Sequence, residues 1–186
     1  MKRILLGGLV GGVALFLWSF VSHVLTPLGE MGIQSIPNED AVIEAMRANI
    51  QQPGFYFFPG LAPNQHNDAA AMKAWEEKAK RGPAGIIIYQ LHGSGMTPQM
   101  LITELASNIL FAILAAFLLS RIGGSFVFRM FAVGIMGLIG GLDVYVSYWN
   151  WYKFPADYTL GVMADQLIGF LIMGAVLAWI VKKAQA

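Results

Sequence analysis

Four long apolar runs divide the chain. They cover residues 4–25, 100–120, 130–148 and 160–181. Each run is close to the roughly 20 residues that a helix needs to cross a hydrocarbon core of about 30 Å. We therefore predict four transmembrane helices.

The first apolar run follows Met-Lys-Arg, as the apolar region of a secretory signal would. The apolar region of a signal is shorter, about 7–15 residues, and it ends at a cleavage site made of small residues. The sequence HVLTPLGEMG that closes this run offers no such site. We expect an uncleaved anchor.

In the polar segment 26–99, between the first and second runs, the spacing of apolar residues is typical of helices in some parts and of strands in others. PNEDAVIEAMRANIQQPG and NDAAAMKAWEEKAKRG predict amphipathic helices, because each has a polar N-cap, a helical stripe of apolar residues and a stop at Pro-Gly or Gly. GFYFFPG and GIIIYQLHG predict short strands, since they are rich in aromatic or β-branched residues and bounded by glycine. The expected inward residues of the two helices are Val42, Ile43, Met46 and Ile50, and Met72, Trp75 and Ala79.

The predicted fold class follows from these patterns. We expect a mainly α membrane protein with four transmembrane helices and a small extracytoplasmic α/β lobe, residues 26–99, between the first and second. A lobe of this size is near the lower limit for a stable core of its own.

Composition supports a membrane location and excludes several kinds of site. Of the 186 residues, 56% are hydrophobic and only 12% are charged, whereas soluble domains have about 25% charged residues. A net charge of +1 gives no basis for nucleic-acid binding. The chain has no cysteine, which excludes disulfides, thiolate metal sites and a cysteine nucleophile.

Basic and aromatic residues predict how the helices sit in the membrane. Both termini in the cytoplasm, as in a bacterial inner membrane, would put the flanking basic residues on the inner side, as the positive-inside rule requires. Aromatic residues at the end of the third run would anchor it at the opposite interface. The basic residues are Lys2, Arg3, Arg121, Arg129, Lys182 and Lys183, and the aromatic ones are Tyr148, Trp149, Trp151 and Tyr152, with Trp18 and Phe20 in the same belt.

Each apolar run holds one ionisable side chain near its outer end. These are His23, Glu104, Asp143 and Asp165. At 1.5 Å per residue they lie about 3–8 Å from the outer ends of the runs, which indicates a single level in the outer leaflet. A carboxylate exposed to lipid would cost roughly 2.5–3.5 kcal/mol, so we expect the four to face the bundle interior.

Two interpretations of this level stay open. It could form a proton or cation site, and a divalent cation is a possible cofactor because carboxylates and imidazole suit such ions. Alternatively, the side chains reach headgroups or water, or hydrogen-bond across the bundle. The polar residues expected to support the level are Ser19, Asn108 and Ser147.

Glycines spaced four apart predict close helix packing. The pairs Gly8/Gly12 and Gly137/Gly141 fit the small-xxx-small spacing that lets helices approach in lipid. Packing within one bundle and a dimer seam are equally compatible with this spacing.

Three function classes follow, and the sequence indicates no catalytic residue. The favoured one is a non-catalytic structural or accessory subunit, whose partners are the lipid bilayer and either a homo-oligomer or a larger membrane complex. The alternative is a proton- or cation-binding transport protein that uses the acidic level. A metal-dependent enzyme is disfavoured, because three histidines are a poor supply of ligands.

Overall fold

The computed structural model describes residues 1–182, which form two compact units. The bundle comprises Met1–Ile33 and the chain from Met96 onward, and the lobe comprises Gln34–Gly95. Lys183, one of the basic residues expected on the inner side, lies outside the described residues.

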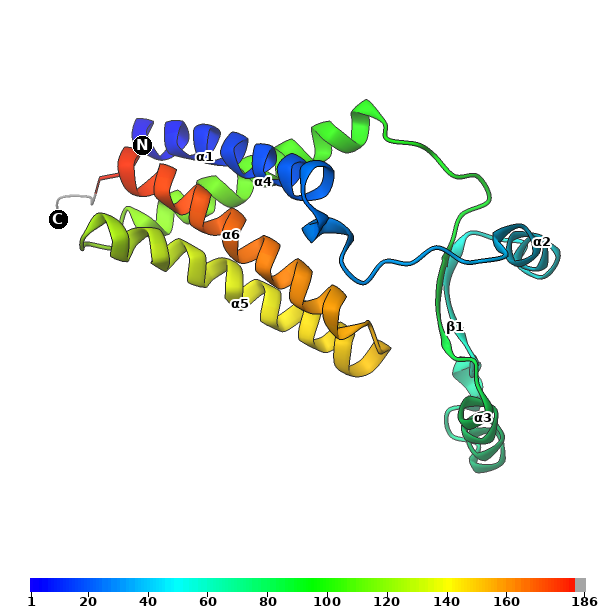
Figure 1. The fold of residues 1–186 in the computed structure, drawn as a ribbon. Coiled ribbons are helices and arrows are strands. Elements are labelled where there is room, and N and C mark those ends of the chain that lie inside the picture. The colour runs from blue at the N-terminus through cyan, green and yellow to red at the C-terminus, as the bar shows by residue number, and fades with distance from the viewer. Residues whose placement is uncertain (183–186) are drawn as a thin grey trace. The chain divides into compact units, whose positions relative to one another are not determined.

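The bundle contains four helices long and apolar enough to cross a membrane, which confirms the predicted fold class. α1 (Lys2–Phe20) continues as a π-helical segment, η1 (Val21–Leu25), and α4 (Pro98–Leu119), α5 (Phe126–Tyr152) and α6 (Ala156–Ile180) follow after the lobe. The N-terminus and the α4–α5 loop lie at one end of the bundle, the terminal end (Figure 1). The chain leaves for the lobe from the other, the lobe-side end.

α5 is longer than its apolar run. It starts four residues before the predicted residue 130, because the hydroxyl of Ser125 accepts a hydrogen bond from the Phe128 amide at 3.2 Å and caps the helix. It runs on through the aromatic residues to Tyr152 and ends at Lys153, which adopts a left-handed conformation with φ 59°. Its 27 residues span about 40 Å, which is longer than a hydrocarbon core of about 30 Å.

The core of the bundle lies toward the terminal end. Small residues let the helices approach there: a Cβ at Gly12 would lie 2.5 Å from Ile109 Cα on α4. Gly137 of α5 likewise packs directly against Phe170 of α6. The buried cluster consists of Leu15, Ala112, Ala115, Ala116, Leu119, Val133, Met173, Leu177 and Val181.

Toward the lobe-side end the bundle opens. α4 and α5 diverge from the loop that joins them (Figure 1). None of the residues 98–107 of α4 or 142–152 of α5 is buried. α1 and α6 remain together between them, because Gly169 of α6 packs against Leu15 and Trp18 of α1. The lobe-side halves of α4 and α5 therefore form the two sides of an open wedge.

The start of the linker after α1 packs on the bundle. It forms a 3₁₀ turn, η2 (Pro27–Glu30), that is capped by the hydroxyl of Thr26. Met31 then contacts Gly161 near the start of α6, where a Cβ on that glycine would lie 2.9 Å from Met31 Cβ. The chain up to Ile33 therefore belongs to the bundle.

The lobe has the predicted mixture of helices and strands. Its elements are α2 (Glu39–Asn49), β1 (Gly54–Phe58), the short η3 (Pro63–Gln65), α3 (Ala69–Arg81) and β2 (Gly85–Tyr89). β1 and β2 pair antiparallel, with Phe55 opposite Ile88. The Asp68 carboxylate accepts hydrogen bonds from two amides in the first turn of α3, as the predicted N-cap requires.

The lobe is loosely packed. The residues expected to face inward on its two helices are the least exposed ones there, but they are only half-buried. No residue between 34 and 95 is buried. The lobe therefore lacks a closed core within the chain.

Candidate functional site

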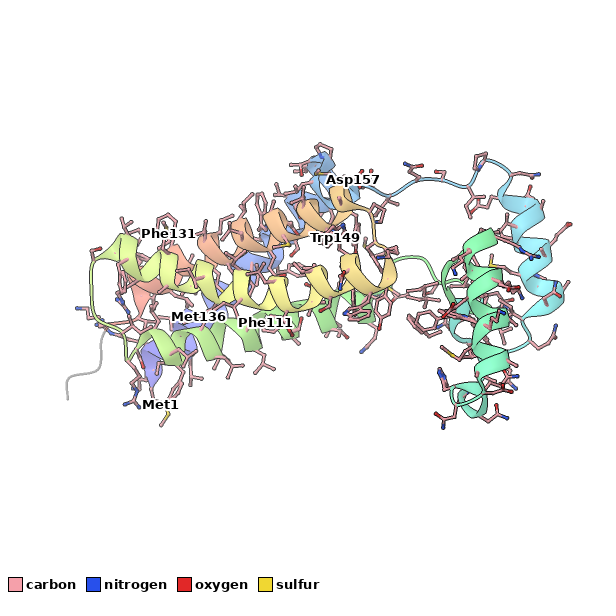
Figure 2. The ribbon with its side chains drawn as sticks, turned by 90° about the horizontal axis from the view of Figure 1, so that it is seen from below. Met1, Phe111, Phe131, Met136, Trp149 and Asp157 are labelled. Atoms are coloured by element: carbon pink, nitrogen blue, oxygen red, sulfur yellow. The ribbon has the colours of Figure 1, made fainter. Side chains whose placement is uncertain are left out.

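Two cavities occupy the lobe-side half of the bundle. The larger, here called the wedge cavity, has a volume of about 630 Å³ and is lined by residues of α1, η1, α4, α5 and α6. Phe111 and Met136, both labelled in Figure 2, line it from α4 and α5. The smaller, the side cavity, measures about 460 Å³ and lies between the start of α4 and the end of the first span.

Three of the four ionisable residues predicted to share a level line the side cavity. They are His23 of η1, Glu104 of α4 and Asp165 of α6. His23 and Asp165 also line the wedge cavity, and so does Ser19. The structure therefore brings residues from three helical segments, distant in sequence, to one region of the bundle.

Asp165 is held by a tryptophan. The indole Nε1–H of Trp18 donates to Asp165 Oδ1 at 2.7 Å and lies 3.2 Å from the Asp165 carbonyl oxygen. This bond ties α1 to α6 and fixes the orientation of the carboxylate. Trp18 was expected in the interfacial belt, but it is half-buried and bonds within the bundle.

His23 and Glu104 are bound mainly to their own segments. His23 Nδ1 lies 2.8 Å from the Ser22 hydroxyl and 3.0 Å from the Ser19 carbonyl oxygen. Glu104 Oε1 accepts a hydrogen bond from the buried Asn108 amide at 3.1 Å. These local bonds orient the two side chains; Asn108 contributes its side-chain amide, whereas Ser19 contributes its backbone carbonyl and its hydroxyl donates to the Leu15 carbonyl.

Asp143 is not part of this arrangement. Its side chain is exposed and lines neither cavity, and Ser147 one turn later is exposed as well. The reason is the rotation of α5, which buries Gly137 and Gly141 against Phe170 and Gln166 of α6. Asp143 follows Gly141 by two residues, about 200° around the helix, so it points away from α6.

The structure gives no support for a metal centre at the acidic level. Within residues 1–182, no group of three or more histidines, aspartates and glutamates is placed to hold a metal ion. The three ionisable residues of the side cavity thus line one space without converging on a point.

Arg129 has a structural position that the sequence did not indicate. It was counted among the flanking basic residues, but it lies in the first turn of α5 and is only 8% exposed. Its guanidinium donates to the carbonyls of Leu119 at 3.3 Å and Ala178 at 3.4 Å, and Nε has no hydrogen-bond partner among residues 1–182. A positive charge at the C-terminal ends of α4 and α6 is favourable, because the carbonyls there carry partial negative charge.

Several residues line the wedge cavity although the sequence did not indicate them as site residues. They are Trp18 of α1, Tyr145 of α5, and Tyr158 and Gln166 of α6. The Gln166 amide also donates to the Gly137 carbonyl at 2.8 Å and so links α6 to α5. A signal was present in α6, where Tyr158, Val162, Asp165, Gln166 and Phe170 share one face by helical spacing.

Comparison with known proteins adds no assignment, because no family model, curated protein or solved structure matches the chain. Any function must therefore be argued from the geometry of the bundle and the lobe.

Proposed function

We propose that this chain is a non-catalytic accessory subunit that is anchored in a membrane and whose lobe binds a partner protein. A second copy of the chain is the simplest partner, and another subunit of a larger membrane complex is the other. The proposal is based on the exposure of the residues in the lobe. No residue of 34–95 is buried, yet one face of its sheet exposes large apolar side chains.

The exposed face is defined by the register of the two strands. Phe55 lies directly opposite Ile88, so both project from the same side of the sheet. Phe55 is 54% exposed and Ile88 is 73% exposed. Contiguous apolar surface of this kind marks an interaction site in soluble parts of proteins.

The sheet of the lobe is small. Within residues 34–95 it has two strands, so each strand has a neighbouring strand on one side only. Two strands are marginally stable in water unless something packs on them. A partner that covers Phe55 and Ile88 would supply the missing core.

The bundle supplies the membrane anchor and, we propose, the orientation. Lys2, Arg3, Arg121 and Lys182 are exposed at the terminal end, which supports a cytoplasmic location for that end and an extracytoplasmic one for the lobe. The exposed rings of Trp149 and Trp151 at the lobe-side end of α5 suit the opposite interface.

Site-specific photocrosslinking tests the proposal. A benzoylphenylalanine at Ile88 in intact cells should give a discrete adduct, whereas the same group at Glu77, exposed on α3, should give little. An adduct of twice the chain mass identifies a second copy, and another discrete mass identifies a different subunit. Absence of an adduct at Ile88, or equal adducts at both positions, would refute an interaction through the sheet face.

A second candidate function has one supporting observation. His23, Glu104 and Asp165 line the side cavity together, and no lysine or arginine lines it. We propose proton or cation binding at this place as the alternative function. Elemental analysis of the purified protein and the pH dependence of Tm for Glu104→Gln test it. A metal-free protein whose pH dependence is unchanged by Glu104→Gln would rule the alternative out.

A further inference from the structure

The wedge cavity is large enough for a small molecule and opens between two helices. Its volume of about 630 Å³ lies within the range of ligand sites, roughly 300–1,000 Å³. At about 30 Å³ for a water-sized group, it has room for about 20 such groups. α4 and α5, which both contribute residues to its lining, diverge toward the lobe-side end (Figure 1).

The two parts of the cavity differ in chemistry. Leu15, Met136 and Phe170 line the part next to the packed core, where Met136 and Phe170 rest against the buried cluster. His23, Tyr158 and Asp165 line the part nearer the lobe-side ends of the helices. The ionisable side chains thus lie toward the lobe-side ends of the helices, whereas the deeper part has apolar side chains together with the amides of Asn108 and Gln166. A molecule with a charged head and an apolar chain matches this distribution.

The polar part favours a positive group. Asp165 provides a carboxylate whose position is fixed by Trp18, and Tyr145 and Tyr158 place aromatic rings on the same cavity. Among the described residues, no lysine or arginine lines it. An anionic head would therefore meet a carboxylate without a lysine or arginine to balance it, whereas an ammonium group would meet a carboxylate and two tyrosine rings, and aromatic rings attract cations.

We propose that the wedge cavity binds an amphiphile with an ammonium head and a single apolar chain. The head lies at Asp165 between Tyr145 and Tyr158, and the chain runs between α4 and α5 toward Phe111 and Met136. A carboxylate on a half-buried part of a membrane helix then has a counter-charge, which the described protein residues around it do not supply.

Two amphiphiles with the same twelve-carbon chain but opposite head charges test whether the cavity prefers an ammonium head. The full chain, purified in dodecyl maltoside, is titrated with dodecyltrimethylammonium or with dodecyl sulfate below their critical micelle concentrations, and Tm is measured. Binding to the folded state alone raises Tm in a saturable way. We expect such a rise with the ammonium compound only. An equal response to the sulfate, or none to the ammonium, would overturn the proposal.

Two variants and a control test the place. Asp165→Asn removes the charge but keeps an oxygen for Trp18, and it should weaken the ammonium effect at least tenfold. Asp143→Asn removes the same charge from the exposed face of α5 and should leave the effect unchanged. If Asp165→Asn does not fold, Gly140→Phe fills the cavity from α5, where a Cβ has room, and should abolish the response. A wild-type response in the folded Asp165 or Gly140 variant would refute the site.

Discussion

The α1–α4 contact makes a quantitative prediction about one methyl group. In Gly12→Ala the new Cβ would lie 2.5 Å from the Cα and 2.7 Å from the amide nitrogen of Ile109. Carbon atoms pack best at about 3.5–4.0 Å, and backbone atoms inside a helix cannot rotate away. The two helices must therefore separate by about 1 Å. Overpacking of this kind costs about 1–3 kcal/mol, and Tm should fall by about 2–4 °C for each kcal/mol.

A second glycine-to-alanine variant, at a helix position with more space, controls for the higher helix propensity of alanine. Alanine is about 1 kcal/mol better than glycine inside a helix, so Gly140→Ala on α5 should be neutral or stabilising. Its Cβ would meet only Gln166 Nε2, at 3.4 Å. Both variants are melted in the same detergent with the wild type. If Gly12→Ala is as stable as Gly140→Ala, the close α1–α4 contact is not present in the protein and the packing argument is wrong.

Two further predictions concern the terminal end. Arg129→Met should lower the free energy of unfolding by about 1–3 kcal/mol, because the carbonyls of Leu119 and Ala178 lose a charged donor. Arg121→Met, at an exposed position, is the control. Equal Tm values for the two variants would contradict a stabilising role for Arg129. The topology can be tested with single cysteines introduced at Gln65 and at Gln185, because the chain has no cysteine of its own. In intact cells, an impermeant thiol reagent should label only Gln65→Cys. Labelling of Gln185→Cys alone would reverse the proposed orientation.

The spans could be predicted from the sequence, but their ends could not. A run of about 20 apolar residues leaves few alternatives in a chain with so little charge, and four such helices are present. Helix ends depend on local capping instead. Ser125 starts α5 before its apolar run begins, and the aromatic residues up to Tyr152 are compatible with both a helix and an interfacial loop.

The candidate site was predicted in part, because sequence gives the depth of a residue better than its direction. Depth along a helix follows from counting residues, and His23, Glu104 and Asp165 do line one cavity. The direction in which a side chain points depends on which face of its helix packs against the neighbouring helices. α5 has glycine at 137, 140 and 141, so small residues point to two different faces. The structure buries Gly137 and Gly141, and this choice turns Asp143 outward.

Small side chains explain why the bundle is closed at its terminal end. Glycine and alanine occupy the contact positions of the terminal half, for example Gly8 and Gly12 on α1 facing α4, so backbones can approach closely. In the lobe-side half Trp18 packs against Gly169 and bonds to Asp165, so α1 and α6 stay together. None of the residues 98–107 of α4 or 142–152 of α5 is buried there, and Trp18, Tyr145 and Tyr158 line the space that is left. The side chains that border this space are therefore the ones that give the wedge cavity its chemistry.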